Sequence, residues 1–136
     1  MPKKPPCPFI AEADQLRAAK EAIEGFAALW IGRLNLSHWS DITQKFHTGL
    51  CPETADCAAR TFSDWKYKYA TIEFYLGVMV NMEPQEQELV VVHELLHVVL
   101  NEMHGASDAN LSEDDRAHEE RVVTELTQAF LRIARG

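Results

Sequence analysis

The sequence has no long uncharged hydrophobic run. No segment reaches the ~18 consecutive apolar residues that a membrane-spanning helix requires, which excludes a transmembrane helix. The first residues also lack the hydrophobic region of a secretory signal peptide. We therefore expect a cytoplasmic protein that does not associate with membranes.

Basic residues are few. The chain has 13 Lys and Arg against 21 Asp and Glu, which gives a formal net charge of -8. A protein dedicated to nucleic acid needs a basic surface to neutralise phosphates. The one local basic cluster, Lys66-Tyr67-Lys68-Tyr69, is too short to provide it. The composition therefore excludes nucleic acid as the main partner.

Cysteines are also scarce. Cys7, Cys51 and Cys57 make an odd number, and Cys51 and Cys57 lack the CxxC spacing of a zinc ribbon. A disulfide framework for a secreted domain is therefore excluded. We expect a reducing compartment and no catalytic role for these thiols.

The hydrophobic content is that of an ordinary globular protein. At 46% hydrophobic and 25% charged residues, the 136-residue chain can bury one core. We expect one domain over 1–136, with a flexible Pro-rich start over 1–8.

The pattern of apolar residues predicts an α+β fold. Helices are expected over 11–31, 84–103 and 112–134, with strands within 34–46 and over 70–80. Pro84 suits the first turn of a helix, and Ser112 with Asp115 resembles a capping box. The segment from Pro84 is too long for a typical strand, so its β-branched residues are assigned to a buried helix.

That buried helix contains the segment Val91–Leu100, VVHELLHVVL. Burying titratable side chains without partners costs several kcal/mol, so this run needs a ligand or protein groups to satisfy it. His93 and His97 are four residues apart and project from one helical face, and Glu94 lies beside them. This is the HExxH pattern, in which two imidazoles bind zinc and the carboxylate is a general base.

A catalytic zinc ion normally has a third protein ligand. Met103 and Leu100 occupy the positions where the metzincin pattern requires His and Gly, so that pattern is excluded. The last helix offers Glu119, which is centred on an apolar stripe made by Val122, Val123, Leu126, Phe130 and Ile133. Glu119 is therefore the expected third ligand.

Other roles on this helix stay open. His118 and Glu120 are the alternative third ligands. Glu119 could instead complement the helix dipole without any metal. Asp115 could cap the helix or orient a histidine ligand from behind.

The motif and the acidic last helix together resemble a zincin metallopeptidase of the minimal gluzincin type. Glu119 follows His97 by 22 residues, a spacing similar to that family's glutamate ligand. The short chain also resembles the small HExxH proteins of bacteria and phages, including the ImmA/IrrE-like and SprT-like groups. The resemblance implies a zincin-like domain with a small, mostly antiparallel sheet, and one Zn2+ ion held by His93, His97 and Glu119.

The resemblance also implies a reaction. The ion would polarise the scissile carbonyl and acidify a water molecule, and Glu94 would take the proton and pass it to the leaving amine. The substrate would be a peptide or protein, paired with the 70–80 strand if that strand lies at a sheet edge. Candidates to stabilise the oxyanion are Tyr67, Tyr69, Tyr75 and His104.

Two other functions remain possible at this level. The chain could be a metal-binding regulatory or interaction module without peptidase activity, although such a module does not require Glu94. It could also be a helical interaction protein whose histidines are satisfied by protein groups. The sequence leaves the oligomeric state open.

Overall fold

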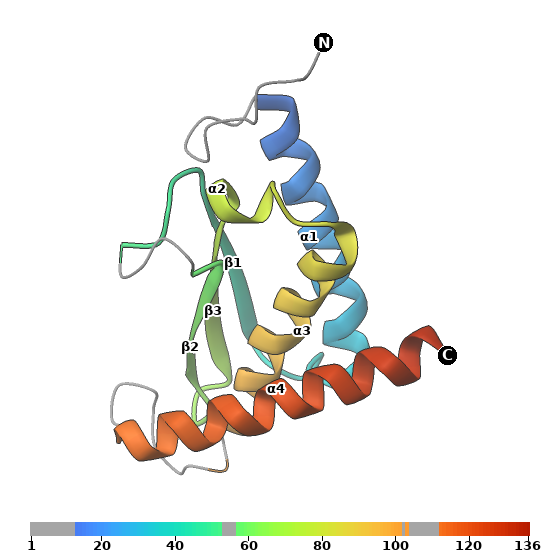
Figure 1. Ribbon diagram of the computed structural model, residues 1–136. Helices are drawn as coiled ribbons and strands as arrows, with labels where there is room; N and C mark the ends of the chain where they lie inside the picture. Colours follow the sequence, from blue (N-terminus) through green and yellow to red (C-terminus); the bar gives the residue numbers. More distant parts are fainter. Residues whose placement is uncertain (1–12, 53–56, 102, 104–111) are drawn as a thin grey trace.

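The computed structural model describes residues 13–52, 57–101, 103 and 112–136. Within them the fold is α+β, with four helices and three strands (Figure 1). In chain order the elements are α1 (Ala13–Arg33), β1 (Asp41–His47), β2 (Ala59–Asp64), β3 (Tyr69–Tyr75), α2 (Leu76–Met79), α3 (Pro84–Asn101) and α4 (Glu113–Arg135). The three predicted helices are confirmed, whereas the flexible start expected over 1–8 lies outside the described residues.

The sheet is mixed, with the strand order β1-β3-β2. β3 pairs parallel with β1 and antiparallel with β2. The expectation of a mostly antiparallel sheet is therefore wrong. β1 and β3 run in the same direction, and β2 runs in the opposite one. Because β3 lies between β1 and β2, its pairing with β1 is parallel. β3 is consequently central, and β2 is an edge strand within the described part of the chain.

The strand expected over 70–80 ends at Tyr75, where the short helix α2 begins. The alternation of large apolar side chains stops there, since Leu76, Gly77 and Met79 are all buried in one turn. Gly77 lies against the loop that follows β1, and a Cβ atom on it would be 2.8 Å from the carbonyl oxygen of Gly49. The close approach of this loop to α2 therefore requires a residue without a side chain at position 77.

Gly77→Ala is expected to lower the free energy of unfolding by about 1–3 kcal/mol, because the methyl group would collide with backbone. Gly25→Ala is the matched control, since Gly25 lies inside α1 with no heavy atom within 4 Å of its Cβ position. That change should leave stability unchanged or raise it by up to about 1 kcal/mol. Urea denaturation measures both. An unchanged midpoint for Gly77→Ala would show that the loop moves away without cost.

The helices lie on one side of the sheet, and α4 crosses the end of α3 (Figure 1). The core between these layers contains Ile23 from α1, Phe74 from β3 and Leu95 from α3, each fully buried. α3 contacts α1, α4 and β2, which explains its near-continuous apolar sequence. His93, Glu94 and His97 lie on the side of α3 that β2 and α4 approach.

α4 begins as the sequence predicts. The hydroxyl of Ser112 accepts a hydrogen bond from the backbone N–H of Asp115 at 3.1 Å, so Ser112 is the N-cap. The buried face of α4 is Glu119, Val123, Thr127 and Leu131, at a spacing of four. Glu119 and Val123 are therefore buried as predicted, but three other residues assigned to the same stripe are exposed: Val122, Phe130 and Ile133.

Candidate functional site

The two histidines and the glutamate of the HExxH motif lie close together on α3. Ligand atoms of His93, Glu94 and His97 all lie within 4.8 Å of one another, a grouping that can hold a metal ion. The two imidazole rings are 5.0 Å apart and meet edge to face. The helical spacing alone produces this convergence, because residues i and i+4 lie one above the other.

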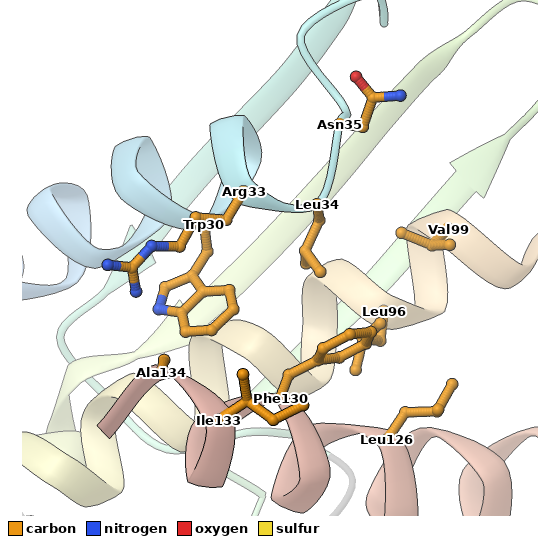
Figure 2. Close-up of a pocket in the computed structure, with 10 residues that line it drawn as sticks. All are labelled: Trp30, Arg33, Leu34, Asn35, Leu96, Val99, Leu126, Phe130, Ile133 and Ala134. Atoms are coloured by element: carbon orange, nitrogen blue, oxygen red, sulfur yellow. The ribbon is translucent and has the colours of Figure 1, made fainter. Parts of the chain in front are cut away.

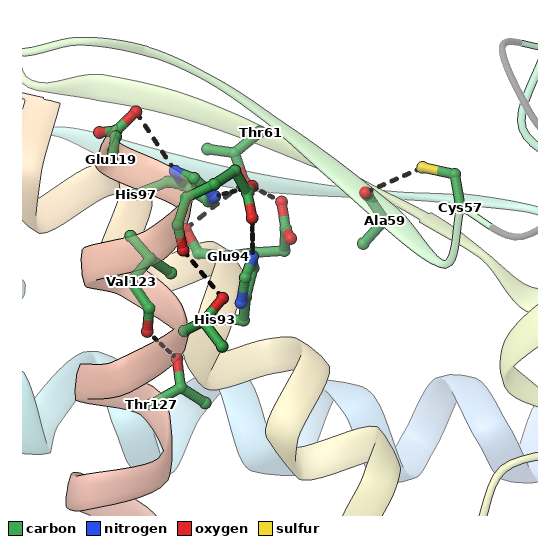
Figure 3. A network of polar contacts seen from close by, with 11 residues as sticks. Cys57, Ala59, Thr61, His93, Glu94, His97, Glu119, Val123 and Thr127 are labelled. Carbon is green, nitrogen blue, oxygen red and sulfur yellow. Dashed lines mark hydrogen bonds and ion pairs between the residues drawn. The ribbon is translucent and has the colours of Figure 1, made fainter. Parts of the chain in front are cut away.

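Glu94 is held in place by the edge strand. Its side chain is buried, and its Oε1 atom accepts a hydrogen bond from the hydroxyl of Thr61 on β2 at 2.8 Å (Figure 3). Burial raises the pKa of Glu94, and the nearby His97, His93 and Thr61 partly offset that rise. Sequence reasoning missed Thr61, because nothing in the local sequence connects β2 with α3.

α4 brings two adjacent glutamates to the histidines, but to different atoms. Glu119 Oε2 lies 3.4 Å from Nδ1 of His97 (Figure 3). Glu120 Oε1 lies 2.8 Å from Nε2 of His97, and Glu120 Oε2 lies 3.1 Å from Nε2 of His93. The carboxylate of Glu120 thus faces both motif imidazoles, whereas that of Glu119 lies behind one of them.

The other residues proposed on this helix lie elsewhere. His118 lines a second, small cavity of about 170 Å3, together with Leu100, Met103, Glu119 and Val122. Asp115 is exposed, and its described role is in the cap with Ser112. Neither has a described contact with His93 or His97.

The charges of the cluster favour a cation between the imidazoles. Burial disfavours a protonated His97, but the carboxylates of Glu119, Glu120 and Glu94 outweigh burial and raise the pKa of His97 to about 10. His93 and His97 in turn hold the pKa of Glu120 far below its ordinary value. The carboxylate of Glu120 and the imidazole of His97 therefore stabilise each other's charged forms.

A cleft of about 300 Å3 opens beside the histidines, between β2 and α4. It is lined by Ala59, Arg60, Thr61, Glu94, His97, Arg116, Glu119 and Glu120. The strand that borders it is therefore β2 and not the 70–80 segment, whose β3 portion lies in the middle of the sheet. The condition for pairing of a peptide with the 70–80 strand, that it lies at a sheet edge, is not met, since both edges of β3 are occupied.

The tyrosines considered for oxyanion stabilisation do not line this cleft. Tyr67 and Tyr69 are exposed and stack on each other. Tyr75 donates its hydroxyl to Glu73 at 2.8 Å. His104 lies outside the described residues. Arg60 and Arg116 also line the cleft, but the guanidinium of Arg60 is bound to Glu73, on the face of the sheet opposite Thr61.

A larger cavity, of about 540 Å3, lies away from the motif between α1, α3 and α4 (Figure 2). Its walls are mainly apolar and include Trp30, Leu96 and Phe130. It contains none of the histidines or carboxylates of the cluster. The chemistry-bearing residues thus gather in the smaller cleft.

The two described cysteines are thiols on the connection that leads into β2. Cys51 is buried, and Cys57 donates to the carbonyl oxygen of Ala59 at 3.2 Å (Figure 3). Burial and a hydrogen bond with Cys51 raise the pKa of Cys57 to about 12. A thiol with such a pKa is a poor nucleophile at neutral pH. Cys7 lies outside the described residues.

Comparison of the chain with protein-family models, curated proteins and solved structures found no match. Among the described residues, no helix has the length and hydrophobicity needed to span a membrane.

Proposed function

We propose that this chain is a zinc-dependent metallopeptidase that hydrolyses peptide bonds, with a site similar to that of minimal gluzincins. One observation carries the proposal. The imidazoles of His93 and His97, the buried carboxylate of Glu94 and the carboxylate of Glu120 converge at the mouth of a cleft bordered by an edge strand.

The donor set fits a zinc ion. Two ligand atoms bound at about 2.0–2.1 Å to one tetrahedral ion lie roughly 3.3 Å apart. Oε1 of Glu120 lies 2.8 Å from Nε2 of His97 and 3.4 Å from Nε2 of His93, which is near this value. We therefore assign His93, His97 and Glu120 as ligands, with one Zn2+ per chain. When bound, the ion supplies Lewis-acid polarisation of the scissile carbonyl and of the attacking water.

Glu119 is better placed as a positioning residue than as the third ligand. Its carboxylate faces Nδ1 of His97, the nitrogen turned away from Glu120. A carboxylate at that position fixes the tautomer and the ring orientation of a metal-binding histidine. This assignment takes up one of the alternatives left open by the sequence, Glu120, in preference to Glu119.

Glu94 is the proposed general base. The hydrogen bond from Thr61 fixes Oε1 and leaves the second carboxylate oxygen to accept a proton from the attacking water. Burial raises the pKa of Glu94, which suits a base that must also release the proton to the leaving amine. The metal-only function remains the alternative, and Glu94 is the residue that distinguishes the two.

The outer edge of β2 is the proposed binding surface for the substrate backbone. Ala59, Arg60 and Thr61 line the cleft on a strand whose other edge is already paired with β3. An extended peptide added there would gain main-chain hydrogen bonds and run past the motif. The substrate is thus a peptide or an extended protein segment.

Two measurements test the proposal as a whole. Purified protein should contain about one zinc ion per chain by elemental analysis. A peptide library should be cleaved, and cleavage should stop on chelation and return with zinc. Protein that holds no zinc under these conditions would contradict the proposal.

The ligand assignment is tested by a matched pair of substitutions. Glu120→Gln is expected to weaken zinc binding by more than about hundredfold, and Glu119→Gln by only about 10–100-fold. The two changes are chemically identical and affect adjacent positions, but Glu120→Gln affects Nε2 of both histidines and Glu119→Gln affects Nδ1 of His97 alone. Competition with a chromophoric chelator measures both affinities. A larger loss for Glu119→Gln would restore Glu119 as the third ligand.

A further inference from the structure

The larger cavity, between α1, α3 and α4, presents apolar side chains to solvent. Leu96 of α3 is buried beside it, whereas Phe130 and Ile133 of α4 are exposed, Ile133 by 75%. A volume of about 540 Å3 lies in the range of cavities that bind small molecules. Exposed apolar side chains gathered around one such cavity are typical of a binding site.

Charge is confined to one end of this cavity. Of the described residues that line it, Arg33 alone is charged, and it lies in the last turn of α1. Its guanidinium is 4.9 Å from the centre of the Trp30 ring. Figure 2 shows both residues at one end of the cavity and Val99 and Leu126 at the other. A molecule lying along the cavity therefore meets a cation at one end and hydrocarbon along the rest.

Within the described part of the chain, no carboxylate is paired with Arg33, whose only polar or ring contact is the one with Trp30. Glu88 of α3 also contacts Trp30, since it accepts a hydrogen bond from the indole Nε1 at 2.9 Å. The charge of Glu88 is matched by Arg135, at 3.1 Å. The N–H donors of Arg33 can therefore bind an anionic group.

We propose that this cavity binds a small amphiphilic anion, namely a carboxylic acid with one unbranched hydrocarbon chain. The carboxylate pairs with Arg33, whose planar set of N–H donors matches its two oxygens. The hydrocarbon chain lies between the three helices, against Leu96 and Phe130. This site is separate from the metal cleft, because the two have no lining residue in common.

Isothermal titration calorimetry with decanoate, below its micelle concentration, tests the proposal. Decanoate should bind at one site per chain. Octanoate should bind roughly tenfold more weakly, since each buried methylene contributes a factor of about three to four. Decyltrimethylammonium has the same hydrocarbon chain and the opposite charge, and should bind about fivefold more weakly than decanoate. Absence of saturable decanoate binding, or equal binding of the anion and the cation, would overturn the inference.

Substitution of the arginine tests the anionic end of the site. Arg33→Gln should weaken decanoate binding about fivefold and remove the preference for the anion. Arg17→Gln is the matched control, because it makes the same charge change on the same helix, outside the cavity. Equal weakening by the two changes would indicate a general charge effect and would contradict the proposed pairing.

Filling the cavity tests its apolar part. Ala134 is exposed and lines the cavity, so Ala134→Phe should weaken decanoate binding by about tenfold or more without disturbing the core. Ala129→Phe is the control, since Ala129 is exposed on the same helix but does not line the cavity. If both variants bind decanoate as the unmodified protein does, the ligand lies elsewhere and the assignment is wrong.

Two other arrangements give different results. A carboxylate bound to the metal cleft would be lost in His97→Ala, whereas the proposed site predicts unchanged decanoate binding in that variant. A second copy of the chain covering the cavity would produce a dimer that Ala134→Phe dissociates, which gel filtration measures. Either result would overturn the inference. Decanoate binding that persists in a protein without zinc or peptidase activity would support it and count against the metallopeptidase proposal alone.

Discussion

Glu94→Gln is expected to reduce peptide hydrolysis by about 100- to 10,000-fold while leaving zinc binding essentially unchanged. The amide keeps the shape of the side chain and can still hydrogen-bond to Thr61, which holds Glu94 at 2.8 Å. It cannot, however, accept the proton of the attacking water. Cleavage of a peptide library followed by mass spectrometry measures the first quantity, and elemental analysis measures the second.

Thr61→Val separates the base from its positioning. This change removes the hydroxyl that donates to Glu94 but keeps the carboxylate, so activity should fall less than in Glu94→Gln. If Glu94→Gln cleaves the library as well as the unmodified protein, the peptidase proposal is wrong. The metal-binding regulatory or interaction module would then be the better description of this chain.

The second large effect is expected for His97→Ala, which should reduce the bound zinc from about one ion per chain to nearly none. His97 contacts Glu120 through Nε2 and Glu119 through Nδ1. Its ring therefore lies between the proposed ligand Glu120 and the proposed positioning residue Glu119. Loss of an outer partner alone typically weakens metal binding about 10–100-fold, and loss of a ligand should exceed that. Equilibrium dialysis against zinc measures the affinity.

His118→Ala is the matched control for His97→Ala. His118 lies on α4 beside Glu119, but its side chain lines the cavity formed with Leu100 and Met103. Zinc affinity should be unchanged in this variant. If His118→Ala loses zinc and His97→Ala keeps it, the metal centre described above is wrongly assigned.

Local sequence signals predicted the helices well, but the sheet less well. Pro84 and the length of the apolar run identified α3, and Ser112 identified the start of α4. β2 gave a weak signal, because Ala59, Thr61 and Ser63 on its core-side face are small or polar. They pair with Phe74, Ile72 and Ala70 of β3, whose larger apolar residues fill most of that face. Alternation of apolar residues therefore could not predict β2, the strand that borders the cleft.

The choice between Glu119 and Glu120 as the proposed third ligand could not be made from sequence patterns. The apolar stripe of α4 correctly indicated that Glu119 is buried. Burial, however, does not determine which imidazole nitrogen a carboxylate meets. Glu120 is half-exposed and lies outside the stripe, yet it faces both Nε2 atoms. A carboxylate that lines a cleft can be half-exposed, so an argument from burial does not single out the residue that we propose as the ligand.

The sequence by itself determined the spacing of His93, Glu94 and His97, because the pitch of one helix brings residues four apart onto the same face. It also determined that this helix is buried and that an acidic helix follows it. Only the tertiary structure decided that Glu120 and Thr61 meet at that face. These contacts depend on how α4 crosses α3 and on which strand forms the sheet edge. Both are set by packing between segments far apart in the chain, which no local periodicity records.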